Sequence, residues 1–286
     1  MTGTDYGWPT DEPTVVIEGP RLTATVLPER GGKISSLRDD QGVEWLGQPD
    51  RPVSGPARPG ADFLTSEMAG WDECAPTIVE CTIGGVVVAD HGELWTKGFE
   101  TSDTGVTVTD DTLGYRFSRD IRPTADGLQF DYRVDSLRGT IPFLWAAHPQ
   151  FLAPPGTRIV MPKHVKRAVD VLAPGLPELD WHDDLGRIDA IDSGGYRKLY
   201  VHPDEPVFEV GLRRPDGAEL TLRWSRECPY LGLWFDRFSY RAEAIIALEP
   251  TTAYFDSLAT AVELGRVPAI SPDQPLTWTL EVTVTR

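Results

Sequence analysis

Cysteine is scarce in this sequence, and positive charge is in short supply. The 286 residues contain three cysteines, Cys74, Cys81 and Cys228, with no C-x-x-C pair among them. This odd number argues against a disulfide framework and against a zinc knuckle. Basic residues number 27 against 44 acidic ones, which gives a net charge of −17. Because nucleic acids and anionic membranes require clustered Lys and Arg, we expect neither as a partner and favour a neutral small molecule.

Long hydrophobic runs are also missing. The longest apolar run near the middle of the chain, residues 143–147, is far too short to cross a bilayer. The first ten residues lack the basic start and apolar core of a signal peptide. We therefore expect a cytoplasmic protein, as a monomer or a homodimer.

Turn-forming residues are abundant, with 27 glycines and 25 prolines. They separate short segments whose composition predicts β-strands. The residues 276–284 alternate strictly between apolar and polar, which is typical of an antiparallel strand covered on one face. No repeat or linker is visible, so we predict one all-β domain over residues 1–286. The predicted strands are 14–17, 22–27, 33–37, 43–46, 106–109, 114–117, 128–134, 208–213, 219–224 and 276–284.

Three titratable residues follow apolar strands directly. Glu249 ends the run 244–248 and precedes Pro250, which is predicted to stop the strand because it has no N–H. His148 follows 142–147 and precedes Pro149 in the same way, and Asp236 closes 231–235 beside Trp234. A buried carboxylate is costly unless partners hold it, so such groups are candidates for proton chemistry. A solvent-facing Glu or a hydrogen-bonded structural His is the alternative for each site.

Other polar and aromatic groups gather in the first third of the chain. His91 lies in a mixed segment with Trp95, and Gly92 beside it permits a close approach of backbone. Residues 67–73 combine acids with an aromatic, in Glu67, Trp71, Asp72 and Glu73, and the alternative here is an exposed acidic turn. The proline- and glycine-rich segment 48–62 is predicted to be a surface loop and a candidate cover for a site.

A metal site is conceivable only around His182, which lies among Asp180, Asp183 and Asp184. Consecutive acids in a loop are more often solvent-facing, so we expect no metal and no cofactor.

The order of these short motifs resembles that of the aldose 1-epimerase, or galactose mutarotase-like, superfamily. The resemblance runs from about residue 15 to the C-terminus and implies a large antiparallel β-sandwich with a sugar groove on one sheet. It further implies Glu249 as general base, His148 as general acid, and His91 and Asp236 as sugar ligands. We add Trp71, Asp72, Trp95 and Trp234 as candidate substrate contacts. The motifs are Gly31-Gly32, Asp90-His91-Gly92, His148-Pro149-Gln150-Phe151, Asp236 and Leu248-Glu249-Pro250-Thr251.

One motif departs from the superfamily pattern. Its members usually carry an Asn-Arg pair before the His-Gly segment, whereas residues 70–76 are Gly-Trp-Asp-Glu-Cys-Ala-Pro. An Arg can only donate hydrogen bonds, and the ionised carboxylate of Asp72 can only accept them. We therefore expect a poor galactose mutarotase, in which Asp72 accepts from a hydroxyl of another sugar.

Interconversion of sugar anomers needs one base and one acid around the anomeric centre, and no metal. Three alternatives remain open at this point. The first is a carbohydrate-binding protein without turnover. The second is an epimerase of a phosphorylated or sulfonated sugar, which requires a basic cluster for which Lys97, Arg167 and Arg241 are candidates. The third is a lyase or glycosidase, which requires a second carboxylate such as Asp72 or Asp236.

Overall fold

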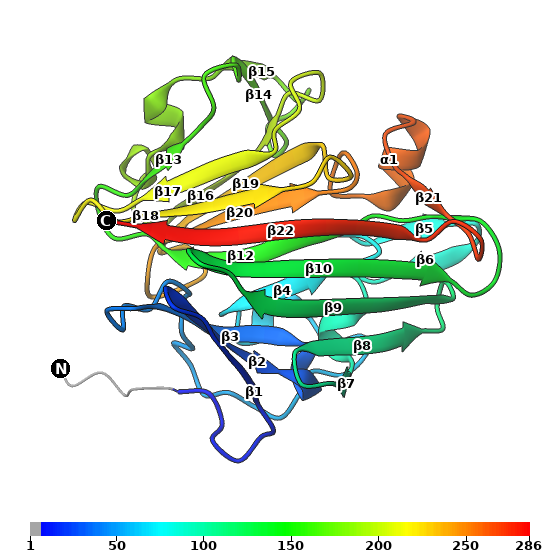
Figure 1. The fold of residues 1–286 in the computed structure, drawn as a ribbon. Coiled ribbons are helices and arrows are strands. Elements are labelled where there is room, and N and C mark those ends of the chain that lie inside the picture. Colours follow the sequence, from blue (N-terminus) through cyan, green and yellow to red (C-terminus); the bar gives the residue numbers. More distant parts are fainter. Residues whose placement is uncertain (1–6) are drawn as a thin grey trace.

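Two large antiparallel sheets, layered face to face, dominate the computed structural model, which describes residues 7–286 (Figure 1). The ten-stranded sheet has the order β1 (Val15–Glu18), β2 (Leu22–Leu27), β3 (Lys33–Asp39), β4 (Trp71–Cys74), β12 (Ala146–Leu152), β20 (Ile245–Thr251), β19 (Tyr230–Arg237), β16 (Gly195–Val201), β14 (Arg167–Asp170) and β15 (Glu178–Asp180). The eight-stranded sheet has the order β13 (Arg158–Val160), β17 (Glu209–Arg213), β18 (Glu219–Trp224), β22 (Leu276–Thr285), β10 (Gly127–Ser136), β9 (Tyr115–Pro123), β8 (Gly105–Asp110) and β7 (Glu100–Thr101).

Smaller elements connect these strands. Two pairs form separate two-stranded sheets, β5 (Cys81–Ile83) with β6 (Val86–Val88), and β11 (Ile141–Pro142) with β21 (Ala269–Ile270). The helical elements are short: α1 (Leu258–Glu263) and the 3₁₀ turns η1 (Pro28–Arg30), η2 (Phe63–Thr65), η3 (Leu94–Thr96), η4 (Asp183–Gly186) and η5 (Ile188–Ala190). Across residues 7–286 no helix is long and apolar enough to span a membrane.

Aromatic side chains fill the space between the two large sheets. Trp71 of the ten-stranded sheet stacks on Phe130 of the other sheet, with ring centroids 5.2 Å apart. The ring centroid of Trp145, which directly precedes β12, lies 4.9 Å from that of Trp278 on β22. Because strand side chains alternate between faces, every second residue of the ten-stranded sheet points into this core. The residues between them point to the opposite side, which we call the outer face.

The predicted all-β, antiparallel sandwich is confirmed, as are the hairpins built from 14–17 with 22–27 and from 208–213 with 219–224. Segment 43–46, however, is no strand and makes only isolated bridges. The reason lies in Glu44, whose carboxylate accepts from the backbone N–H groups of Leu37, Trp45 and Leu46. The carboxylate therefore competes with strand pairing for these donors, and the N–H of Trp45 is shared with the carbonyl of Leu37.

The prediction that Pro149 and Pro250 end their strands is wrong, because both lie inside β12 and β20. The two strands pair at Ala146–Thr251 and again from Gln150–Ala247 onward. Between these points lie the two prolines, neither of which has an N–H to contribute. The ladder is therefore interrupted where His148 and Glu249 face each other.

Candidate functional site

Cross-strand pairing brings a row of polar residues together on the outer face. Asp72 on β4 is paired with His148 on β12. Glu249 on β20 follows in the next strand and is paired with Gly232 on β19, which is paired with Tyr200 on β16. We call these five residues the acid–base row. The sequence interpretation expected His148 and Glu249 at strand ends, but the structure places them near the middle of the sheet.

Glu249 and His148 are in direct contact. Nδ1 of His148 lies 3.3 Å from Oε1 of Glu249, and the two residues are 7% and 1% exposed. The other carboxylate oxygen, Oε2, accepts a hydrogen bond from Nζ of Lys198 on β16. That amino group also lies 3.5 Å from Oδ1 of Asp256. The buried carboxylate is therefore held between two nitrogen donors.

These contacts determine the charge of the group. Burial raises the pKa of Glu249, but the positive charge of Lys198 and the contact with His148 outweigh it and lower the pKa to about 2. Glu249 is thus ionised at neutral pH and can only accept hydrogen bonds. In the contact between Glu249 and His148, Nδ1 of His148 must therefore be the donor and carry the hydrogen. Burial lowers the pKa of Lys198, yet the carboxylates of Asp256 and Glu249 raise it above its ordinary value.

Asp72 sits at the other end of the row, next to a second buried lysine. Nζ of Lys33 donates to Oδ2 of Asp72 at 2.6 Å and to the carbonyl of Ala69 at 3.0 Å. The second oxygen of Asp72, Oδ1, is buried and has no hydrogen-bond partner within residues 7–286. Leaving such an acceptor unpaired is costly, so it indicates a place for a donor from a bound molecule or water.

A second row runs beside the first. Gln150 on β12 is paired with Ala247 on β20, which is paired with Trp234 on β19, and that tryptophan is paired with Lys198. Gln150 is fully buried, and in the described part of the chain neither atom of its amide has a partner. Ala247 has only a methyl group and Gly232 has no side chain, so few side-chain atoms rise above the middle of the outer face. A methyl group on Gly232 would come 3.0 Å from Oε2 of Glu249.

An aromatic residue covers the acid–base row. Phe63, in η2, stacks on His91 with ring centroids 3.8 Å apart and meets His148 edge-on at 5.7 Å. It follows the predicted surface loop, and we call residues 48–68 the cover loop. Trp95 packs edge-on against Phe63 at 5.1 Å. The ring over the row therefore comes from the residue directly after the loop 48–62 that was predicted as a candidate cover.

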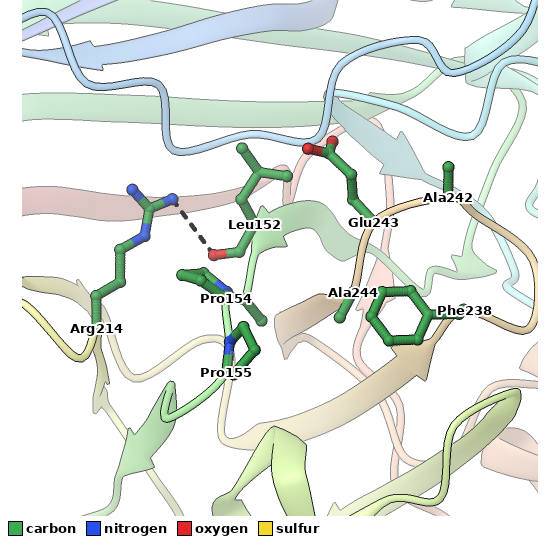
Figure 2. Close-up of a pocket in the computed structure, with 9 residues that line it drawn as sticks. Leu152, Pro154, Pro155, Arg214, Phe238, Ala242, Glu243 and Ala244 are labelled. Atoms are coloured by element: carbon green, nitrogen blue, oxygen red, sulfur yellow. Dashed lines mark hydrogen bonds between the residues drawn. The ribbon is translucent and has the colours of Figure 1, made fainter. Parts of the chain in front are cut away.

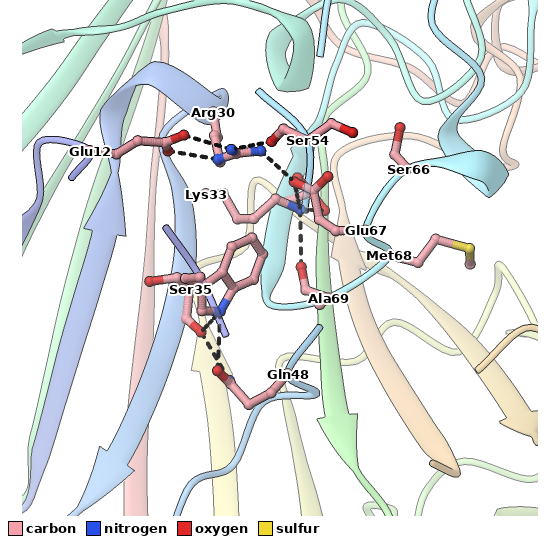
Figure 3. Close-up of polar contacts among 12 residues, drawn as sticks. Glu12, Arg30, Lys33, Ser35, Gln48, Ser54, Ser66, Glu67, Met68 and Ala69 are labelled. Atoms are coloured by element: carbon pink, nitrogen blue, oxygen red, sulfur yellow. Dashed lines mark hydrogen bonds and ion pairs between the residues drawn. The ribbon is translucent and has the colours of Figure 1, made fainter. Parts of the chain in front are cut away.

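Cationic side chains fix the base of the cover loop (Figure 3). Arg30 binds the carboxylate of Glu12 and donates to the carbonyl of Ser54 at 2.6 Å. Lys33, through Ala69, holds the chain just after the loop. Arg241, from the turn between β19 and β20, donates to the carbonyls of Gln48 and Met68 at the two ends of the loop.

The backbone of His91 adopts an unusual conformation, which sets the direction of its side chain. Its φ of +58° lies in the left-handed region, which non-glycine residues seldom adopt. Gly92 follows with φ +72°, and a Cβ there would lie 2.0 Å from the carbonyl oxygen of Ala75. The expected close backbone approach at Gly92 is confirmed. The ring of His91 lies 5.6 Å from that of His148, and its Nδ1 contacts Asp90 at 2.7 Å.

Two predicted substrate contacts lie elsewhere. Trp71 is fully buried in the core between the sheets, because the short strand β4 turns its ring inward and Asp72 outward. Asp236 is also fully buried, and its Oδ1 accepts from the backbone N–H groups of Ser239 and Tyr240, which fixes the turn after β19. We therefore assign neither a contact with substrate.

The acidic group at 67–73 is not an exposed turn. Glu73 is fully buried on the core side of β4, 2.5 Å from Nη1 of Arg119 and 2.7 Å from the indole nitrogen of Trp145. Burial raises the pKa of Glu73, and the charge of Arg119 opposes that rise. This ion pair joins β4 to β9 of the other sheet.

Sequence analysis missed Lys198, Gln150 and Phe63. Lys198 lies in a region where loops were expected, although Tyr196, Lys198 and Tyr200 recur at every second position, which is the period of a strand. The three thiols are free, with Cys74 and Cys228 buried. Within residues 7–286 no group of three or more His, Cys, Asp or Glu could hold a metal ion, and this includes the loop around His182.

Comparison with solved structures places this fold. The chain superposes on a putative aldose 1-epimerase from Escherichia coli K12 with a TM-score of 0.71 and 16% identity, covering 96% of this chain and 99% of that one. A galactose mutarotase-like protein from Lactobacillus casei superposes with a TM-score of 0.71 and 18% identity, covering 96% of this chain and 100% of that one. A protein from Synechocystis superposes with a TM-score of 0.74 and 15% identity, covering 100% of this chain and 99% of that one.

No family model and no curated protein sequence matches this chain. The structural likeness nevertheless extends over nearly the whole of each neighbour, so it concerns the complete sandwich and not a shared fragment. The resemblance carried by the short sequence motifs is therefore confirmed at the level of architecture, and the chain has the galactose mutarotase-like fold.

Proposed function

We propose that the protein is an aldose 1-epimerase that interconverts the α- and β-anomers of a neutral free sugar. The observation that carries the proposal is the buried contact between His148 and Glu249 on the outer face, beside unpaired polar atoms of Asp72 and Gln150. An ionised carboxylate and an imidazole that share one site supply a base and an acid without a metal.

The reaction uses the two groups in turn. Glu249 takes the proton from the C1 hydroxyl while Nε2 of His148 gives a proton to the ring oxygen, and the C1–O5 bond breaks. Rotation about the C1–C2 bond then presents the other face of the aldehyde, and reversed proton transfers close the ring. The mechanism requires a proton on Nε2 of His148 for transfer to the ring oxygen, in addition to the Nδ1 proton in the contact with Glu249. Each positioned proton transfer contributes about 10²–10⁴-fold.

The charges around the site favour a neutral sugar over an anionic one. The candidate cations for a phosphate or sulfonate are engaged elsewhere: Lys97 lies 3.0 Å from Asp110, and Arg167 lies 2.9 Å from Glu205. Arg241 donates to backbone carbonyls of the cover loop. The buried lysines of the outer face, Lys33 and Lys198, are each paired with a carboxylate.

The same geometry weakens the glycosidase alternative, because the second carboxylates available to it are tied up. Asp236 is bound by the backbone of its own turn, and Asp72 is bound by Lys33. Asp72 keeps one buried oxygen free to accept from a sugar hydroxyl, and Gln150 has both a donor and an acceptor. We therefore propose that these two side chains choose the sugar and that galactose is not preferred.

Polarimetry on freshly dissolved aldoses tests the proposal. Glu249→Gln keeps the shape of the side chain but cannot take a proton, so we expect kcat to fall by at least about 10²-fold, and the same for His148→Asn. Matched controls are Glu243→Gln, at an exposed position just before β20, and His164→Asn, on an exposed contact with the carbonyl of Pro206.

Circular dichroism separates loss of chemistry from loss of fold. Glu249→Gln leaves Lys198 with Asp256 at 3.5 Å as its remaining carboxylate, so a lower melting temperature with a retained fold is expected. Mutarotation at the parental rate in a folded Glu249→Gln protein would remove Glu249 from the mechanism. Sugar binding without turnover in the parent protein would favour the carbohydrate-binding alternative.

A further inference from the structure

We infer that the protein has a second sugar subsite, formed by Tyr196, Trp234 and Tyr240, and that its substrates are reducing oligosaccharides. The inference rests on the proposed function and extends it to the part of the outer face beyond the acid–base row. Of these three residues, Trp234 alone was a candidate from the sequence.

The three rings form one aromatic group. Tyr196 on β16 lies 5.4 Å from Trp234 on β19, measured between ring centroids, and 5.2 Å from Tyr240. The distance between Trp234 and Tyr240 is 5.8 Å. Tyr196 is 47% exposed, which is unusual for so large an apolar ring with two aromatic neighbours, and the other two are partly exposed.

This aromatic group continues directly from the acid–base row. Trp234 and Gly232 are two residues apart on one strand, which separates them by roughly 7 Å on the same face. Trp234 is also paired with Lys198, whose amino group holds Glu249. Tyr196, in turn, is two residues from Lys198 on β16 and points to the same side. A ligand that extends away from Glu249 across Lys198 therefore meets Trp234 first and then Tyr196.

The chemistry of the group matches that of a pyranose ring. Aromatic faces pack against the apolar C–H faces of a sugar, and the phenol hydroxyls bond to its edge. The two charged residues paired with the group are engaged elsewhere: Asp236 is buried and bonded to the turn, and Lys198 is paired with Glu249 and Asp256. A neutral ring is therefore favoured over a phosphate or a nucleotide.

The mechanism requires a free C1 hydroxyl in the row, so the second ring must be attached through another hydroxyl of the first sugar. This defines the substrate class as oligosaccharides with a reducing end. Tyr240 also packs against the group of Phe63, Met68 and Trp95, and its carbonyl accepts from Arg51 of the cover loop. The subsite thus lies beside the cover, on the side from which a longer substrate would extend.

Another cavity on the molecule provides the control. It has a volume of about 330 Å³ and is lined by Leu152, Pro154, Pro155, Phe238 and Arg214, with no residue of the acid–base row or of the aromatic group (Figure 2). Phe238 in its wall is 44% exposed, close to the value for Tyr196. Phe238→Ala therefore removes an equally exposed ring near β19 without touching the subsite.

The experiment measures kcat/KM for mutarotation of glucose and galactose and of the disaccharides cellobiose, maltose, lactose and melibiose. We expect at least one disaccharide to be a better substrate than either monosaccharide. In Tyr196→Ala, the ratio of disaccharide to monosaccharide kcat/KM should fall about tenfold, as for loss of an aromatic contact in a binding site. Trp234→Ala should lower both values and the ratio as well. Phe238→Ala should leave the ratio unchanged.

Failure of this inference is distinct from failure of the proposed function. An unchanged ratio in Tyr196→Ala, with both sugars still turned over, overturns the subsite and leaves the epimerase intact. If no sugar is turned over, titration calorimetry with the same disaccharides decides the matter. Disaccharide binding that Tyr196→Ala weakens supports the subsite, and the absence of binding by the parent protein overturns it.

Discussion

Replacing Lys198 by methionine should change the pH dependence of the reaction in a defined direction. The pKa of Glu249 is about 2, against an ordinary value of 4.5, and the charge of Lys198 is the largest influence that lowers it. An opposite charge at this range lowers a carboxyl pKa by about 1 to 3 pH units. In Lys198→Met the pKa should therefore rise to about 3 to 5. Because Glu249 must be ionised to act as the proposed base, the acid limb of kcat/KM should rise with its pKa.

The free energy of unfolding should also depend on the ionisation of Glu249. The pKa of Glu249 is lower in the folded protein than in the unfolded chain, so its ionisation stabilises the fold above pH 4.5, and this contribution is lost as the pH falls towards 2. The fall from 4.5 to about 2 corresponds to on the order of 3 kcal/mol. Lys198→Met should lower the free energy of unfolding at pH 7 by about 1–4 kcal/mol, with a smaller loss at pH 3.

The assay is polarimetry between pH 3 and pH 8, with urea unfolding at pH 7 and pH 3. Lys198→Arg retains the charge and should keep activity at low pH. Lys33→Met is the matched control, because Lys33 is an equally buried lysine of the same face that pairs with Asp72 instead. The reasoning fails if the acid limb stays where it is in Lys198→Met, or if Lys33→Met moves it as far.

Two further predictions concern the cover and the core. Phe63→Ala removes the ring that covers His148, so diethyl pyrocarbonate should modify His148 about tenfold faster, a change of about 1.4 kcal/mol. Mass spectrometry follows the modification. An unchanged rate would mean that the loop does not shield the histidine. Arg119→Met leaves Glu73 buried without its cation and should cost about 3–5 kcal/mol of unfolding free energy. The control Arg122→Met breaks an exposed pair with Asp131 and should leave stability unchanged, and equal effects of the two variants would contradict the buried-pair argument.

Local pattern was enough to predict the all-β class and several of the strands, although 43–46 is no strand and β14 and β15 lie where loops were expected. Alternation in 276–284 predicted an antiparallel strand with one buried face, and β22 lies between β10 and β18 with that burial. Such patterns act through nearest neighbours along the chain, so they survive without knowledge of the tertiary fold. The same holds for the association of Glu249 and His148 with apolar strands, although the sequence placed them at the ends of these strands and they lie inside β12 and β20.

Side-chain direction in short or interrupted strands was beyond local pattern. In β4, four buried residues alternate between faces, and the sequence does not say whether Trp71 or Asp72 points to the core. Pro149 and Pro250 signalled strand ends, yet both are accommodated because they lie in the stretch where the ladder between β12 and β20 is interrupted. The outcome depends on which strand lies alongside, and that is a property of the whole sheet.

The sequence by itself therefore determined the architecture and showed His148 and Glu249 next to apolar strands, while the tertiary structure decided that these two residues meet and what surrounds them. Lys198 reaches Glu249 across 51 positions of the chain, and Phe63 reaches His148 from a loop that precedes it by more than eighty. The first contact arises from the order and register of strands in the ten-stranded sheet, and the second from the loop between β3 and β4 that folds over β12. Cross-strand register is set by long-range packing of one face against the core, which no window of the sequence contains.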